Sequence, residues 1–600
     1  MSQKKFNRRK FLRTGAVLTG AVLTGSTGAS TEVPERPEKT STGFGLSQAL
    51  ENGEELYNGI RLPSDWPPRD MDPNSYEPMP LPYLKSPPEV IPIDVGRQLF
   101  VDDFLIEKTD LTRSFHQPVK YKMNPVLKPE TKGEMNNRYC PVAAPFSDGV
   151  FYDPTDRLFK LWYMAGWFDG TAFAISEDGI HWQRPHVNKV PGTNLVLNPE
   201  GLRRDGASVW LDHDPENPAE RFKMYWWARK GAIGRVLKED GGHLLTSPDG
   251  IHWNWRGRIG SSGDNTTFFY NPFRKVWVFT VRRQGRPAPP WSDDQKPGEK
   301  RGMGRARSYW ENKDFFAALE NWDVYDPVFW LGADKFDNKR RHYPLSNEPQ
   351  LYKVDAVGYE SLMLGFLQIH YGPPNEQCAK GGFPKLTELQ IAFSRDGFHW
   401  DRTNRQTFIG ATLQKDSWER AYIHSTGGVC CIVGDNLYFY YTAFQGDESN
   451  KNPLEYWSGM YAKASTGLAI LRRDGFASME AGKEEQMLYS RVLKFSGKYL
   501  FVNLDAPDGQ LCVVLCDKDG NPIPGYTRQD CIPLKGDSTK RLVQWKNNQD
   551  IEALAGTPVR FKFYLVKGKI YSFWVSKGSD GASRGATAAG GPGLKGYWDI

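Results

Sequence analysis

Cysteine is scarce in this 600-residue chain, which has seven cysteines and no Cys-x-x-Cys pair. Without that spacing the sequence offers no zinc knuckle, and the odd number leaves at least one cysteine without an intramolecular partner. No apolar run reaches the roughly 20 residues that a membrane-spanning helix needs. We therefore expect no metal centre, no cofactor and no membrane span.

Excess charge is also lacking once the first 30 residues are set aside. The formal net charge is +6, but residues 1–30 carry six basic and no acidic residues, and 71 of each sign remain after them. A chain without a general basic field is not expected to bind nucleic acid. These numbers are still compatible with a local basic groove for an acidic or sulfated glycan.

The first 30 residues are predicted to be a targeting segment. Residues 7–12 read Asn-Arg-Arg-Lys-Phe-Leu, a twin-arginine signature, and a mildly apolar run over 15–25 follows it. This pattern is typical of a signal peptide that directs a protein to the periplasm or out of the cell. The Pro-rich residues 31–90 are expected to form a linker.

One seven-residue phrase occurs three times. Its copies are Ser176–Trp182, Ser247–Trp253 and Ser394–Trp400, each reading Ser-x-Asp-Gly-x-His-Trp. Asp-Gly favours a tight turn, because Asp can bond back to the backbone and Gly tolerates positive φ. Weaker copies at 312–322 and 472–476 bring the number to five, at intervals of 65 to 82 residues. Such self-similarity predicts a repeat architecture.

We therefore expect an all-β fold with a five-bladed β-propeller over residues 91–483 and four antiparallel strands per blade. The alternative is a long array of β-sandwiches. Over residues 484–577, short strands separated by turns predict an accessory C-terminal β-sandwich. The Gly- and Ala-rich residues 578–600 predict a loose tail.

With these turn phrases the chain resembles the superfamily of five-bladed propeller glycosidases that includes invertase-, arabinanase- and mannoside-phosphorylase-like enzymes. The resemblance covers roughly residues 95–577. It implies a propeller that is often followed by a β-sandwich, with the chemistry on the innermost strands of a central funnel. Sialidases carry a similar turn with one more residue before the Gly, so that six-bladed class fits less well.

Glycoside hydrolysis needs two carboxyl groups that flank the scissile bond. Acids that precede predicted inner strands are Asp205, Asp264, Glu360 and Glu419. We expect Asp205, Asp264 and Glu360 to converge as the catalytic acids. Glu360, next to an apolar run, is assigned as general acid, Asp205 as base or nucleophile, and Asp264 as the group that holds the acid or the sugar.

The first predicted blade departs from the superfamily pattern. Residues 136–139 and 143–146 hold no acid, whereas much of the superfamily has an Asp nucleophile or base there. Further residues are expected to bind the substrate: Arg138, Arg282, Glu388, Glu419, Tyr422 and His370. Arg305 and His424 are weaker candidates for the same role, and no spacing of histidines supports a metal site.

These residues predict an exported glycoside hydrolase that acts on a polysaccharide or an oligosaccharide. The missing acid of the first blade favours a different class, a non-catalytic glycan-binding propeller. A glycoside phosphorylase is a third alternative, because it would need one acid and a cationic pocket for phosphate.

Overall fold

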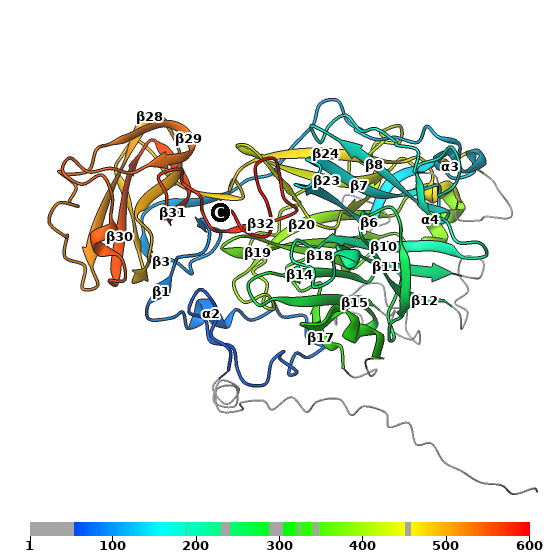
Figure 1. The fold of residues 1–600 in the computed structure, drawn as a ribbon, viewed down its shortest axis with the longest axis horizontal. Coiled ribbons are helices and arrows are strands. Elements are labelled where there is room, and N and C mark those ends of the chain that lie inside the picture. The colour runs from blue at the N-terminus through cyan, green and yellow to red at the C-terminus, as the bar shows by residue number, and fades with distance from the viewer. Residues whose placement is uncertain are drawn as a thin grey trace, which may run out of the picture. The chain divides into compact units, whose positions relative to one another are not determined.

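The computed structural model describes residues 53–600, except for residues 188, 230–239, 287–303, 321, 323–325, 340–346 and 451–457. The predicted signal peptide and the first part of the predicted linker lie outside these residues. The described chain is mostly β, with strands that curl into several sheets (Figure 1). None of its helices combines the length and the apolar character that crossing a bilayer requires.

Residues 142–332 form three successive groups of antiparallel strands, which we number 1 to 3. Group 1 comprises β6 (Val142–Asp153), β7 (Leu158–Ala165), β8 (Gly170–Ser176) and β9 (Leu195–Leu197). Group 2 comprises β10 (Arg203–Leu211), β11 (Phe222–Arg229), β12 (Gly241–Ser247) and β13 (Asn254–Arg258). Group 3 comprises β14 (Thr267–Asn271), β15 (Val276–Arg286), β16 (Gly304–Asn312) and β17 (Val328–Gly332).

Two further groups follow in the chain. Group 4 comprises β18 (Gln350–Glu360), β19 (Leu362–Gly372) and β20 (Leu386–Ser394). Group 5 comprises β21 (Ala421–Ser425), β22 (Cys431–Val433), β23 (Asn436–Phe444) and β24 (Ala464–Arg472), together with β5 (Val119–Lys120), which precedes group 1 in the chain. We call β6, β10, β14, β18 and β21 the inner strands, because each begins its group and lies against the inner strand of a neighbouring group.

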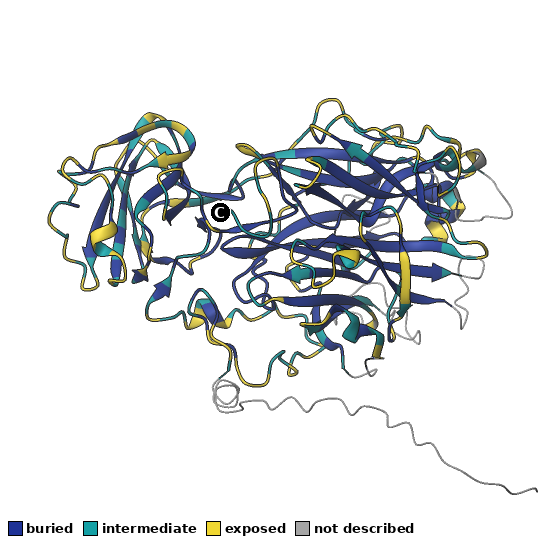
Figure 2. Ribbon diagram, in the orientation of Figure 1, coloured by how far each residue is buried: buried dark blue, intermediate teal, exposed yellow. Residues whose placement is uncertain are grey.

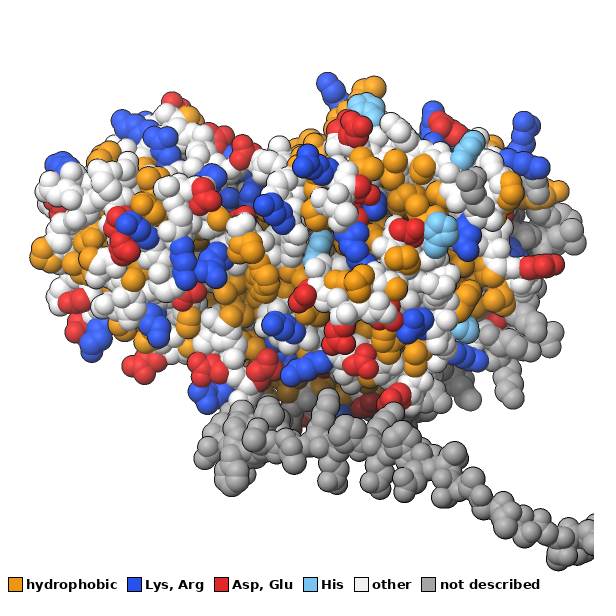
Figure 3. All heavy atoms as spheres, viewed as in Figure 1, with side chains coloured by type: hydrophobic (Ala, Val, Ile, Leu, Met, Phe, Trp, Pro, Cys, Tyr) orange, Lys and Arg blue, Asp and Glu red, His pale blue; other side chains and the backbone are white. Residues whose placement is uncertain are grey.

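Burial separates the inner strands from the outer ones. Every residue of β6 is buried, as is every residue of β18 after its first, so both faces of these strands are covered. The outer strand β13 is exposed along nearly its whole length. Figure 2 shows the same contrast, with dark strands inside the groups and exposed residues along the loops. On the face in Figure 3, acidic and basic side chains are interspersed.

The structure confirms that the repeated phrase forms a turn. In each copy one oxygen of the Asp accepts two backbone N–H groups, and its other oxygen lies 2.7 Å from the His Nδ1 atom. Burial alone would raise the pKa of Asp249, but its bonds with His252 lower it to about 2. The His of the phrase therefore serves the turn.

The same turns also join neighbouring groups. Trp162 of group 1 donates to the Gly250 carbonyl of group 2, and Trp330 of group 3 donates to the Phe398 carbonyl of group 4. Tyr440 of group 5 donates to the Gly179 carbonyl of group 1. Since β24 also pairs with β6, group 5 lies beside group 1 and the series of groups closes on itself.

A separate 11-stranded sheet is built from strands that precede the five groups in the chain and strands that follow them. It contains β1 (Ile91–Pro92), β2 (Gln98–Leu99), β3 (Ile106–Thr109), β4 (Thr112–Phe115), β25 (Ala477–Ala481), β26 (Gln486–Ser490), β27 (Leu493–Lys494), β28 (Tyr499–Asp517), β29 (Leu534–Leu542), β30 (Val559–Val566) and β31 (Gly568–Ser576). Alternate residues of β30 are buried, which is typical of a strand with one face in the core. Residues 91–115, expected in the propeller, thus supply four strands to this sheet instead. The buried Phe100 explains why, because its ring packs on Phe563 and Phe573.

The C-terminal segment was expected to be loose, but much of it is packed. Its strand β32 (Ala586–Thr587) pairs with the end of β18, and Ala586, Ala588 and Ala589 are buried. A Cβ on Gly591 would lie 1.7 Å from the carbonyl oxygen of Ile432. The small residues of this segment therefore permit a close approach to groups 4 and 5.

The remaining elements are short helices. They are α2 (Pro82–Lys85), α3 (Lys132–Met135), α4 (Asn375–Gly381), α5 (Ser458–Tyr461), and the 3-10 helices η1 (Asn136–Arg138), η2 (Pro218–Glu220), η3 (Phe315–Glu320) and η4 (Glu552–Leu554). All seven cysteines are buried, and none of them forms a disulfide in the described structure.

Candidate functional site

A cavity of about 420 Å³ lies where the inner strands begin. Each of the five groups contributes at least one residue to its wall: Phe146, Asp205, Asn265, Tyr352 and Tyr422. The other residues that line it are Trp167, Phe168, Trp227, Arg229, Ser262, Gly263, Asp264, Arg282, Arg305, Asn375, Lys385 and Tyr461. The cavity therefore combines aromatic faces with a dense set of charged groups.

Two predicted acids, Asp205 and Asp264, meet in this cavity around one guanidinium. The Nη2 atom of Arg229 lies 2.6 Å from Asp205 Oδ2 and 3.0 Å from Asp264 Oδ2. These distances together keep the two oxygens no more than about 5.6 Å apart, which is less than the roughly 6.5–9.5 Å between the two carboxyl groups of inverting glycosidases. Asp264 also forms an ion pair with Arg282. Burial would lower the pKa of Arg229, but Asp205 raises it above its usual value.

Tyr352 has an unusual set of neighbours on the other side of the cavity. Its hydroxyl lies 3.0 Å from the hydroxyl of Tyr422 and accepts a hydrogen bond of 3.1 Å from Lys385 Nζ. The guanidinium of Arg305 lies 5.3 Å from its ring. Burial alone would raise the pKa of Tyr352, but Lys385 and Arg305 lower it to about 7. A tyrosine in this state can exchange a proton near neutral pH.

Two buried histidines stand behind these tyrosines. His370 lies 5.8 Å from the ring of Tyr352, and His424 lies 4.3 Å from the ring of Tyr422. Within the described part of the chain, neither imidazole has a hydrogen-bond partner. Burial lowers the pKa of both well below the usual value, so both rings are neutral at pH 7.

Backbone strain coincides with this wall of the cavity. Tyr422 has a φ of 54°, in the left-handed region that bulky residues seldom adopt. The pairing of β21 with β23 shifts its register at the same place, between Ala421 and His424. Strained backbone concentrates at binding and catalytic sites, so this observation agrees with a functional role for the cavity.

No protein-family model matches the chain, and no curated protein matches its sequence. Solved structures do resemble it. An N-acetylgalactosamine deacetylase from F. plautii, in complex with blood group B trisaccharide, matches over 61% of this chain and 96% of its own, at 14% identity and a TM-score of 0.38.

Two other similar structures are named as glycosidases. A fructofuranosidase from Schwanniomyces occidentalis, complexed with fructosylnystose, covers 74% of this chain and 98% of its own, at 12% identity and a TM-score of 0.33. A thermostable family-43 glycoside hydrolase covers 56% and 93%, at 10% identity and a TM-score of 0.35. Similarity at this level does not establish a shared fold or activity, so the function has to be inferred from the cavity itself.

Glu360 does not join the other two acids, and this corrects the prediction of three converging carboxylates. It lies in the turn that ends β18, eight residues from Tyr352 and so about 26 Å along the strand. The sequence predicted an inner strand after Glu360, but β18, which ends at Glu360, is the inner strand of group 4 and β19 is the next. Glu360 therefore follows the inner strand instead of preceding it.

Three of the residues expected to bind substrate also lie outside the cavity. Arg138 is exposed on η1. Glu388 accepts hydrogen bonds from Thr407 and the Ala411 N–H, and Glu419 pairs with Lys120 at 2.9 Å. The contacts of the two glutamates are with the loop 407–411, with β5 and with Tyr441 of β23, so their positions reflect packing.

The outcome for the other predicted binding residues is mixed. Arg282 and Tyr422 line the cavity, as does the weaker candidate Arg305. His370 stands behind Tyr352 without lining the cavity itself, and His424 packs on Phe146 at 4.2 Å.

Group 1 does carry an acid, two residues beyond the segment 143–146. Asp148 is fully buried and pairs with Arg204 through both of its oxygens, at 2.8 and 2.9 Å. It does not line the cavity. The first group therefore supplies three aromatic residues, Phe146, Trp167 and Phe168, and no carboxylate to the site.

Arg229, Tyr352 and Lys385 were not predicted from the sequence. Carboxylates ahead of inner strands were the signal for the site, and Tyr352 stands at such a position without being an acid. Arg229 ends β11, four residues after Tyr225, whose hydroxyl bonds the Gly263 carbonyl at the cavity wall. The strand alternation could have placed Arg229 on the side of Tyr225, whereas Lys385 precedes its strand and left no comparable signal.

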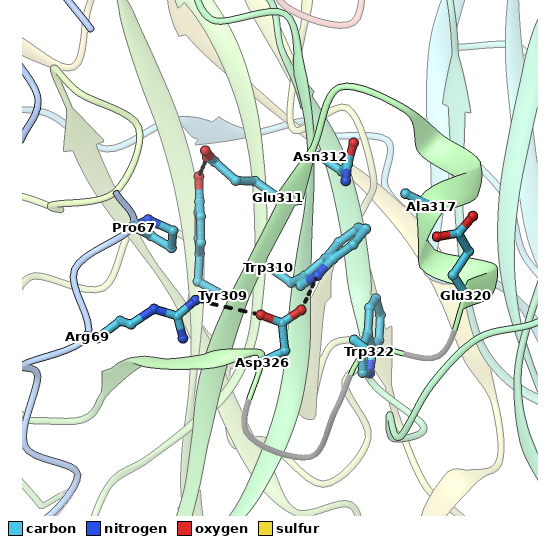
Figure 4. A pocket seen from close by; sticks show the side chains of 10 residues that line it. All are labelled: Pro67, Arg69, Tyr309, Trp310, Glu311, Asn312, Ala317, Glu320, Trp322 and Asp326. Carbon is cyan, nitrogen blue, oxygen red and sulfur yellow. Dashed lines mark hydrogen bonds and ion pairs between the residues drawn. The ribbon is translucent and has the colours of Figure 1, made fainter. Parts of the chain in front are cut away.

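A second cavity, of about 650 Å³, lies between residues 67–69, β16 and η3 (Figure 4). Two of its three acids are engaged: Asp326 contacts Arg69 and accepts from Trp310 at 3.1 Å, and Glu311 pairs with Arg274 and Tyr309. Among the described residues, only group 3 and the N-terminal segment line it. It therefore lacks the convergence of groups that marks the first cavity.

Proposed function

We propose that the protein is an exported glycoside hydrolase that acts on a polysaccharide or oligosaccharide. In this proposal strand groups 1 to 5 are the five blades of a β-propeller, and the 11-stranded sheet is an accessory β-sandwich. The cavity at the start of the inner strands is then the funnel in which one sugar unit binds against Trp167, Phe168 and Trp227.

The observation that carries the proposal is the pair of carboxylates around Arg229. A carboxylate in such a cavity can attack the anomeric carbon or activate a water molecule, as in retaining and inverting glycosidases respectively. We assign Asp205 as the nucleophile or base, and Asp264, which Arg282 also holds, as the group that orients the sugar. With Glu360 excluded by its position, Tyr352 is our candidate for proton transfer to the leaving oxygen, because its pKa of about 7 suits both directions of transfer.

A non-catalytic glycan-binding propeller is the second candidate. Two observations favour it: arginines hold both carboxylates, and group 1 offers no acid to the cavity. A binding module would retain sugars without releasing any product.

Turnover separates the two candidates. We would incubate the purified protein with plant and marine polysaccharides and measure new reducing ends, with mass spectrometry to distinguish hydrolysis from phosphorolysis. Asp205→Asn and Asp264→Asn should each lower hydrolysis of an identified substrate by about 100-fold or more. The exposed acid Asp519 on the 11-stranded sheet gives the matched control, Asp519→Asn, which should keep full activity.

Binding without release of product by the wild type would favour the glycan-binding module. Full activity in both cavity variants would refute the assignment of the carboxylates while leaving hydrolysis in place. Export is tested separately by N-terminal sequencing of periplasmic protein, which should begin near residue 30; a cytoplasmic chain that retains Met1 would contradict it.

A further inference from the structure

Positive charge is in excess at the end of the cavity that holds Tyr352. Arg229 and Arg282 are paired with Asp205 and Asp264. Arg305, Arg307 and Lys385 differ from them: among the described residues, none of these three forms an ion pair with a carboxylate. Arg305 and Lys385 line the cavity, and Arg307 lies behind them on β16.

Two of these cations are also poorly solvated, whereas Arg305 is half-buried and donates to Gln350 at 2.7 Å. Lys385 is 1% exposed and Arg307 is fully buried. Arg307 donates to the Asn265 carbonyl at 2.9 Å, but its Nε and Nη2 atoms have no partner in the described structure, and neither does Arg305 Nε. Burial, with Arg282 nearby, lowers the pKa of Arg307 to about 9. Burying unpaired charge is costly, so a site of this kind is stabilised by an anion that enters it.

We propose that this end of the cavity is an anion subsite, which binds the carboxylate or sulfate group of an acidic sugar through Arg305 and Lys385. Arg307 adds to the positive field from behind. The inference deepens the proposed function, on which it depends for the assumption that the ligand is a sugar. A planar guanidinium and an ammonium group together suit either oxyanion, because both present several acceptor oxygens.

Within the protein, the Tyr352 hydroxyl makes the contact with Lys385 that a bound anion would make. As a phenolate it is a counter-charge for Lys385 within the protein, and the entering oxyanion would take over that contact. The phenol would then keep its proton, as a donor to a leaving oxygen must. The charged and titratable groups that face Tyr352 are Lys385, Arg305, Arg282, Tyr422, Tyr461 and the two neutral histidines.

Calorimetry with matched sugars tests the subsite without requiring turnover. The probes are galactose, galacturonate and galactose 6-sulfate, and oligosaccharides of the same three kinds. We expect at least one acidic series to bind about 10-fold or more tightly than its neutral counterpart, and Arg305→Gln and Lys385→Met each to remove about 10-fold of that preference. The uronate and sulfate arms show which oxyanion the site takes.

Two further measurements control for surface binding and for variants that do not fold. Lys518→Met, on the exposed surface of the 11-stranded sheet, is the control and should bind as the wild type does. If a cavity variant does not fold, the wild type still decides, because binding of the acidic probe at pH 8 should reduce the tyrosinate ultraviolet absorbance and galactose should not.

Equal affinity for acidic and neutral probes would overturn the subsite, as would unchanged preference in both folded variants. Hydrolysis of neutral glycans with no acidic preference would refute the subsite alone. Tight binding of acidic probes without any hydrolysis would support the subsite and contradict the proposed hydrolase.

Discussion

The two ends of strand β18 carry buried charges that differ in whether they have partners of opposite charge. At its final residue, Glu360 accepts hydrogen bonds from Arg473 at 2.9 Å and Ser583 at 2.6 Å. Beside it, Asp474 pairs with Arg97 at 3.0 Å. At the other end Tyr352 faces Lys385 and Arg305, and no described carboxylate pairs with either.

The comparison distinguishes a structural cluster from a site prepared for a ligand. Burial would raise the pKa of Asp474, yet Arg97 and Arg473 lower it, so each charge in the cluster has a partner within the protein. At the Tyr352 end the charges do not balance. Both clusters are buried and titratable, so burial alone cannot separate a functional residue from a structural one.

Removal of the Glu360 charge should have the largest effect. Glu360→Gln leaves Arg97 and Arg473 facing two carboxylates, Asp474 and Asp599, instead of three. Loss of one partner from a buried ion pair costs about 3–5 kcal/mol. Urea unfolding should report this loss, and sugar binding in the folded variant should be unchanged. Glu77→Gln, at an exposed ion pair with Lys335, should change the free energy of unfolding by less than about 1 kcal/mol.

A folded Glu360→Gln variant of normal stability that has lost sugar binding would reverse the assignment of the two ends.

At the Tyr352 end of β18, removal of a cation should not lower the free energy of unfolding. Arg307→Met takes away a buried charge without a carboxylate partner and keeps a side chain of similar length. We expect the free energy of unfolding to stay the same or to rise by about 1 kcal/mol, as for other buried charges replaced by apolar groups. Urea unfolding at low salt is the measurement. A loss of more than about 2 kcal/mol would mean that Arg307 is as well compensated as Arg97.

A further effect concerns pH. The pKa of Tyr352 is lowered from its usual value near 10 to about 7 in the folded protein. Its contribution to stability is therefore fully present above about pH 10 and is lost as the pH falls towards 7. The free energy of unfolding of the wild type should rise relative to Tyr352→Phe between pH 7 and 9.

Tyrosinate absorbance gives an independent reading of the same group. A transition near pH 7 should be present in the wild type, absent in Tyr352→Phe and retained in Tyr139→Phe, which removes an exposed hydroxyl. If the transition survives in Tyr352→Phe, another group is responsible for it.

Local signals in the sequence predicted the turns well and the site only in part. The Ser-x-Asp-Gly-x-His-Trp phrase contains all the groups that form its hydrogen bonds, so Asp178, Asp249 and Asp396 could be placed without the fold. Asp205 and Asp264 could be found because each stands near the start of an inner strand. Glu360 was misplaced because two adjacent apolar strands, β18 and β19, look alike in sequence.

Other features depend on contacts between distant residues. The pKa of Tyr352 is set by Lys385, which precedes β20, and by Arg305 on β16, and no spacing in the sequence relates the three. The C-terminal residues look flexible by composition, but their small side chains let β32 approach β18 closely. Composition cannot distinguish a glycine that allows motion from one that allows close packing.

The cluster around Glu360 also bears on how the chain is made. Its partners include Arg97 and Ser583, so groups from nearly opposite ends of the described chain must meet. A ribosome releases β18 long before it has added residue 583. Contacts between residues so far apart in sequence slow folding. The nascent protein would therefore expose part of its largest core until synthesis is almost complete, a period in which chaperones can protect it.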